Sequence, residues 1–143
     1  LAEQRELPRV EVPAGPGLFP EALEVLAGLE ILEADWPVLL RRSGTAAPTA
    51  VPEALLERLA VYFAFRWLLK AVNDGDLLGR AQLCLLMVLT ARRLAGVCGL
   101  AEAVRRLCSE IEHSDENLEA LLAAFRTGET LSPAAFFRTL AEG

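Results

Sequence analysis

The stretch LCSEIEHSDENLEALLAAF, residues 107–125, repeats its apolar side chains at the spacing of an α-helix. At 100° per residue, one stripe carries the apolar positions Val104, Leu107, Cys108, Ile111, Leu118, Leu122 and Phe125. Ser114 and Asp115 form a polar layer inside that stripe. We therefore expect one long helix from Leu100 to Phe125 that continues through the polar layer, and Gly128 should end it.

On this helix Glu110, His113 and Asn117 fall together, on the side opposite the apolar stripe. Side chains of these types ligate metals, orient a substrate amine or hold a neighbouring domain by hydrogen bonds. A solvated acidic face with a surface histidine is the simpler interpretation. The chain has no H-E-x-x-H motif, and His113 has no Ser or Cys within evident helical reach, so neither a zinc site nor a catalytic triad is indicated.

A second informative stretch is YFAFRWLLKAVNDGDLLGR, residues 62–80. A helix from Pro52 to Val72 is expected here, and Asn73, Asp74 and Gly75 should stop it. The helix is apolar nearly all round, which predicts a place in the middle of a bundle.

Tyr62, Arg66 and Lys70 lie four residues apart along one edge of this helix. A buried arginine needs a partner, because an unpaired charge in a protein core costs several kcal/mol. The nearest expected carboxylates are those of Glu110, Glu112 and Asp115. The interpretation is a structural ion-pair network, and NDGD at residues 73–76 reads as two helix caps rather than a calcium loop.

The remaining chain predicts more helices and no strand. Proline and glycine positions and apolar spacing indicate helices over 20–33, 35–40, 77–97 and 133–140. Residues 1–19 form a Pro/Gly-rich extended arm, and residues 43–50 form a loop of small residues. The expected fold is all-α, a single bundle of about five to six helices over residues 20–143.

The chain is unusually apolar for its length. Apolar residues make up 53% of its 143 residues, and the mean hydropathy is +0.34. The apolar run between Arg80 and Arg92 is about half of the roughly 20 residues that a bilayer requires, so we expect a buried helix there and no membrane span. No secretory leader is recognisable at Leu1. The apolar surface must then be hidden in the core, in an oligomer, or against another domain.

The net charge and the cysteine positions further limit the partners and cofactors that we expect for this chain. The net charge of −6 argues against nucleic acid as a partner, because phosphate binding needs a basic surface. Cys84, Cys98 and Cys108 lie in apolar helical sequence without C-x-x-C spacing, which predicts free, buried thiols in a reducing, cytoplasmic compartment. A zinc or iron–sulfur site held by this chain alone is not expected, since it would need four well-placed ligands.

The two quoted motifs, in this order and about thirty residues apart, resemble the C-terminal region of bacterial flagellin lysine N-methylases. LEILEADWPVLL, residues 29–40, is similar to the segment before the first motif in that family, so the resemblance covers residues 23–125. It implies methyl transfer from S-adenosylmethionine to flagellin lysines, with an iron–sulfur cluster held by a cysteine-rich N-terminal part. That cysteine-rich part is absent from this chain.

The resemblance carries over a set of motif positions without assigning a role to any of them. These positions are Tyr62, Arg66, Lys70, Asp74, Asp76, Glu110, Glu112, His113, Ser114, Glu116 and Asn117. The implied partners are an N-terminal domain of the same protein and flagellin. We expect no cofactor to be bound by this chain alone.

Two classes of function remain open. In the first, the chain is the helical domain that supports or completes a lysine methylation site. In the second, it is a non-catalytic protein-interaction or dimerisation module; a ligand-binding bundle of the regulator type is a weaker third. The apolar composition predicts a large exposed apolar patch or a homodimer in either case.

Overall fold

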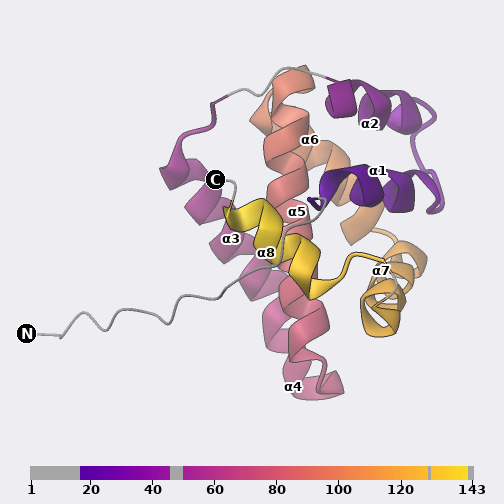
Figure 1. The fold of residues 1–143 in the computed structure, drawn as a ribbon, viewed down its shortest axis with the longest axis vertical. Coiled ribbons are helices and arrows are strands. Elements are labelled where there is room, and N and C mark those ends of the chain that lie inside the picture. Colours follow the sequence, from indigo (N-terminus) through magenta and orange to yellow (C-terminus); the bar gives the residue numbers. More distant parts are fainter. Residues whose placement is uncertain (1–16, 46–49, 129, 142–143) are drawn as a thin grey trace, which may run out of the picture.

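The computed structural model describes residues 17–45, 50–128 and 130–141, and these residues are helical with no strand among them (Figure 1). The all-α fold expected from the sequence is confirmed. The α-helices are α1 (Phe19–Ala27), α2 (Trp36–Thr45), α3 (Glu53–Trp67), α4 (Ala71–Asp74), α5 (Leu77–Cys98), α6 (Leu100–Leu107), α7 (Asp115–Thr127) and α8 (Pro133–Ala141). Their number exceeds the expected five to six, because two of the predicted helices are interrupted.

Helix α5 runs through the middle of the molecule, and α2, α3, α6, α7 and α8 all pack on it (Figure 1). It begins where expected, because the carboxylate of Asp76 accepts a hydrogen bond from the amide of Gly79 at 3.0 Å. Its side chains Leu83, Leu86, Met87 and Leu94 are fully buried, as the sequence predicts.

By length and composition α5 is the one helix of the described residues that is apolar enough to cross a bilayer. Of its most apolar window 56% is buried inside the protein, which is typical of a core helix.

The prediction that the helix over residues 52–72 lies in the middle of the bundle is wrong. Helix α3 covers one side of α5 and buries fully only Phe63 and Trp67, whose rings stack at 5.0 Å. A 3₁₀ turn, Leu68–Lys70, and α4 continue it to Gly75, which ends the segment at a φ of 71°. The outer apolar side chains of α3 therefore face away from the core.

The expected long helix from Leu100 to Phe125 is also interrupted. Helix α6 ends at Leu107, and a π-helical turn follows, Cys108–Glu112, in which the amide of His113 donates to the carbonyl of Cys108 at 3.1 Å. Ser114 is extended, and its hydroxyl caps α7 by accepting from the amide of Asn117 at 3.2 Å. A serine cap that satisfies a free helix amide stabilises this break, which periodicity alone does not reveal.

The N-terminal part differs from expectation in its boundaries. The first helix ends at Ala27 rather than near Glu33, and α2 extends through Ser43, which was assigned to the loop over residues 43–50. Ser43 is buried and donates to the carbonyl of Leu40 at 2.7 Å. Leu18 is fully buried, so the fold begins inside the predicted arm over residues 1–19; residues 1–16 and 46–49 lie outside the described residues.

Candidate functional site

The π-helical turn places Glu110 inside the molecule, against the loop that joins α1 to α2. Its side chain is fully buried and accepts hydrogen bonds from the amides of Leu32 at 3.0 Å and Glu33 at 2.7 Å. Each oxygen of this buried carboxylate thus has a hydrogen-bond partner. Glu110 therefore holds the α1–α2 loop.

Asn117, in the first turn of α7, fixes the same loop. Its amide oxygen accepts from the amide of Glu30 at 3.0 Å, and its NH₂ group donates to the carbonyls of Glu30 at 2.9 Å and Glu110 at 2.7 Å. The prediction that Glu110, His113 and Asn117 share an outer face is thus wrong for Glu110 and Asn117. The extra residue of the π turn and the break at Ser114 rotate them inward.

Two other motif residues of this segment lie at the surface. His113 is exposed, and Glu116 is exposed beside Glu30. The hydrogen bond and negative charge of Glu116 raise the pKa of Glu30. Among residues 17–45, 50–128 and 130–141, no three His, Cys, Asp or Glu side chains are grouped closely enough to hold a metal ion.

The two sequence motifs meet at one point, between α3 and the π turn. Arg66 forms an ion pair with Glu112, as the sequence predicts, although the burial is the reverse of that expected. The Glu112 side chain is 4% exposed and the Arg66 side chain 51%. The hydroxyl of Tyr62 donates to the Glu112 carboxylate at 3.4 Å. We call Tyr62, Arg66, Glu112 and the adjacent Cys108 the α3–π-turn cluster.

Two groups of this cluster are held protonated. Burial, followed by its hydrogen bond to Glu112, raises the pKa of the Cys108 thiol to about 12. Burial and the Glu112 charge also raise the pKa of Tyr62. Because a nucleophilic cysteine needs a lowered pKa, the cluster holds no activated nucleophile. Burial likewise raises the pKa values of Cys84 and Cys98. All three thiols are free, and they are half-buried rather than fully buried.

Asp74 and Asp76, motif residues that follow α3, stabilise the turn that leads into α5. Asp74 accepts two hydrogen bonds from the guanidinium of Arg80, at 2.8 and 3.1 Å, which lowers the pKa of its carboxyl. Asp76 caps α5 and lies 3.6 Å from Arg126 of α7. The expected double cap at NDGD is therefore present at Gly75 and Asp76. Lys70 is exposed on the 3₁₀ turn.

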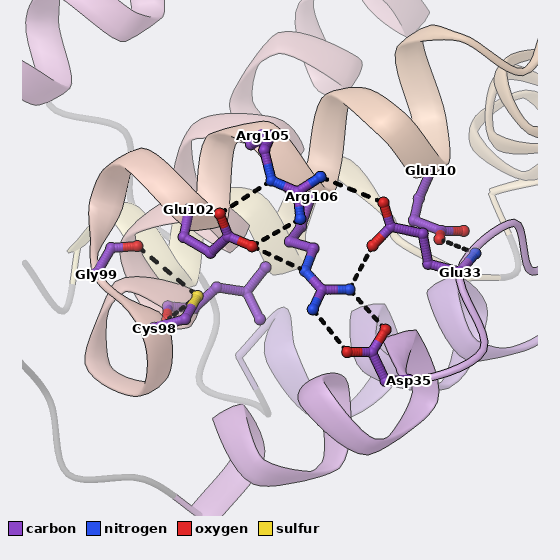
Figure 2. Close-up of polar contacts among 9 residues, drawn as sticks. Glu33, Asp35, Cys98, Gly99, Glu102, Arg105, Arg106 and Glu110 are labelled. Carbon is purple, nitrogen blue, oxygen red and sulfur yellow. Dashed lines mark hydrogen bonds and ion pairs between the residues drawn. The ribbon is translucent and has the colours of Figure 1, made fainter.

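An ion-pair network that the sequence did not reveal joins α6 to the α1–α2 loop (Figure 2). Arg106 binds both oxygens of Asp35 at 2.6 Å and also contacts Glu33 and Glu102. Arg105 donates to Glu102 at 2.7 and 2.9 Å, which lowers the pKa of Glu102 to about 2. The contacts of Glu102 with Arg105 and Arg106 follow from their spacing of three and four residues on one helix. Those with Glu33 and Asp35 do not, because these two acids lie about seventy residues away in sequence.

Comparison of the chain with protein-family models, with curated proteins and with solved structures finds no match. Five of the eleven carried-over positions cap helices, fix the α1–α2 loop or pair across the turn into α5: Asp74, Asp76, Glu110, Ser114 and Asn117. In the α3–π-turn cluster Tyr62 and Arg66 reach solvent, beside the outer side of α3.

Proposed function

We propose that this chain is a helical protein-interaction domain whose binding surface is the outer side of α3 and its continuation. The observation that carries the proposal is a row of exposed apolar side chains spaced four, four and three residues apart. The row consists of Val61, Phe65, Leu69 and Val72, which we call the α3 docking face. Phe65 is 70% exposed and Val72 88%.

The α3 docking face is comparable in size to the largest apolar patch of a typical monomeric protein. The exposed parts of the four side chains present on the order of 400 Å² of apolar surface, the size of patch that often marks a functional contact. At about 25 cal/mol per Å², covering that area would contribute roughly 10 kcal/mol before the entropic costs of association. Isolated exposed apolar residues need no explanation, but a row of them along α3, the 3₁₀ turn and α4 favours a partner.

A second candidate follows from the resemblance, and one specific observation favours it. Tyr62 and Arg66 come from the first quoted motif and Glu112 from the second, and the three side chains meet. In this proposal the chain is the C-terminal helical domain of a cytoplasmic flagellin lysine N-methylase. It would support a site that an N-terminal domain completes, and that domain would supply S-adenosylmethionine and the iron–sulfur cluster.

Site-specific photo-cross-linking in the cells that natively produce this protein tests whether the α3 docking face binds a partner. A photoreactive leucine analogue at Leu69 should give a discrete protein adduct, because that side chain lies in the row. Phe65→Ser with Val72→Ser should remove the adduct, whereas Val38→Ser on α2, an equally apolar exposed position, should leave it unchanged. An adduct that persists in the Phe65/Val72 variant would contradict the proposal.

Titration calorimetry with S-adenosylmethionine separates the two candidates. An interaction domain with no cofactor pocket should show no binding below millimolar concentration. A dissociation constant in the low micromolar range would favour a direct role in methyl transfer.

A further inference from the structure

Exposed apolar surface extends beyond the four side chains of the α3 docking face. Leu55 and Tyr62 are 43% and 45% exposed, and at 100° per residue they project within about 80° of Phe65. With these two side chains the exposed apolar surface of this side is on the order of 600 Å². Two such surfaces in contact would bury roughly 1,200 Å², the lower end of the range for specific, stable interfaces.

The charges on this side of the molecule balance one another. Arg66 is neutralised by Glu112, and the other exposed charges of the segment are two acidic and two basic side chains, Glu53, Glu57, Arg58 and Lys70. The net charge of −6 therefore resides elsewhere on the chain, where salt at physiological strength screens it beyond about 8 Å. A balanced apolar surface selects neither an acidic nor a basic partner, and two copies of it are not kept apart by like charge.

The order of these charges along the helix favours an antiparallel pair. The part before Val61 carries two glutamates and one arginine, so it is negative by one charge. The part after Phe65 carries Lys70 in addition to the neutral pair of Arg66 with Glu112, so it is positive by one charge. In an antiparallel pair the negative end of each copy lies at the positive end of the other, and the helix dipoles also oppose each other favourably.

The apolar row has the symmetry that such a pair requires. Val61 and Leu69 each lie four residues from Phe65, one before it and one after it. Side chains spaced four residues apart form a ridge, and two ridges of this kind interdigitate when the helices cross at about −50°. With a two-fold axis at Phe65, the two phenyl rings meet at the centre, and Val61 of each copy lies against Leu69 of the other.

We propose that the α3 docking face binds the same face of a second copy of this chain, antiparallel about Phe65. The inference rests on the proposed interaction function and names the partner of that surface. The contact covers every large apolar side chain that α3, the 3₁₀ turn and α4 leave exposed.

Sedimentation velocity of the whole chain measures the self-association. We expect a dimer with a dissociation constant on the order of 10 µM, because the buried area is at the lower end of the stable range. The dimer should be at least as tight at about 500 mM salt as at about 50 mM, since salt does not screen apolar burial. Phe65→Ser should weaken it at least about tenfold, whereas Val38→Ser, an exposed apolar position on α2, should leave it unchanged. A chain that stays monomeric at about 500 µM would overturn the inference.

A charge pair built across the interface tests its geometry. Val61→Lys or Leu69→Glu alone should weaken the dimer about tenfold, because each places an unpaired charge in an apolar contact. The double variant should bind at least about threefold more tightly than either single variant, because the new lysine of each copy faces the new glutamate of the other. Both positions are exposed, so circular dichroism should show that all three variants remain folded. Single variants without effect, or a double variant no tighter than they are, would overturn the inference.

The outcomes separate the inference from the function on which it rests. The adduct from Leu69 in cells should have twice the mass of the chain. An adduct of any other mass would overturn the second copy but keep the docking face, and an adduct that persists in the Phe65/Val72 variant would overturn the function as well. Binding of the chain to phosphatidylglycerol vesicles that Val72→Ser abolishes would assign the face to lipid and overturn the inference.

Discussion

Replacing Arg66 with methionine should destabilise the protein more than replacing Glu112 with glutamine. Sequence reasoning treats Arg66 as the buried charge and would order the two substitutions the other way. In the structure the Glu112 side chain is 4% exposed and Arg66 is 51% exposed. Arg66→Met therefore strands a buried carboxylate, whereas Glu112→Gln leaves an arginine that water already reaches.

The loss of stability in each variant depends on which hydrogen-bond partners and how much solvent remain around the unpaired side chain. Breaking a fully buried pair by removing one partner costs about 3–5 kcal/mol. Here the half-exposed guanidinium and the remaining hydroxyl of Tyr62, 3.4 Å from Glu112, reduce that cost, so we expect about 1–2 kcal/mol for Arg66→Met. Glutamine at position 112 still accepts from Tyr62 and carries no charge, and its cost should stay below about 1 kcal/mol.

Urea unfolding monitored by tryptophan fluorescence measures both values. Trp36 of α2 and Trp67 of α3 are both buried in the core, so their fluorescence reports its loss. With an m-value of about 2 kcal/mol per M, Arg66→Met should lower the midpoint by roughly 0.5–1 M at unchanged slope. The double variant should regain most of this loss. If Glu112→Gln costs more than Arg66→Met, the assignment of the carboxylate as the buried member is wrong.

Three further outcomes follow from other contacts. Asn117→Ala should lower the free energy of unfolding by about 2 kcal/mol, because it removes both bonds to Glu30 of the α1–α2 loop, and a loss under about 0.5 kcal/mol in urea would refute this. Cys108 should react with iodoacetamide at pH 8.5 more slowly than Cys98, because its pKa of about 12 leaves little thiolate. Mass spectrometry measures the two alkylation rates, and equal rates would refute this. The pKa of Glu102 is lowered from 4.5 to about 2, so its stabilising effect is present above pH 4.5 and is lost as the pH falls to 2. The melting temperature of Glu102→Gln should therefore decline less over this pH range than that of the unchanged protein, and an identical decline would refute this.

The helices and the core of this protein could be read from its sequence. Apolar spacing identified the buried face of α5, and Asp76, Gly75 and Gly128 marked where helices begin and end. These signals are local, because caps and turns satisfy backbone groups within a few residues. The ion pair of Arg66 with Glu112 was also foreseeable, since an arginine on an apolar helix requires a carboxylate.

The sequence by itself determined an all-α chain and a short list of polar residues, but tertiary structure decided which sides of the helices are covered. A helical wheel shows which residues share a side and does not show where a neighbour packs. For that reason α3 was expected inside the bundle, yet its row from Val61 to Val72 is exposed. The π turn likewise moved Glu110 inward, because its carboxylate binds amides of a loop about eighty residues away, a contact that only the folded chain creates.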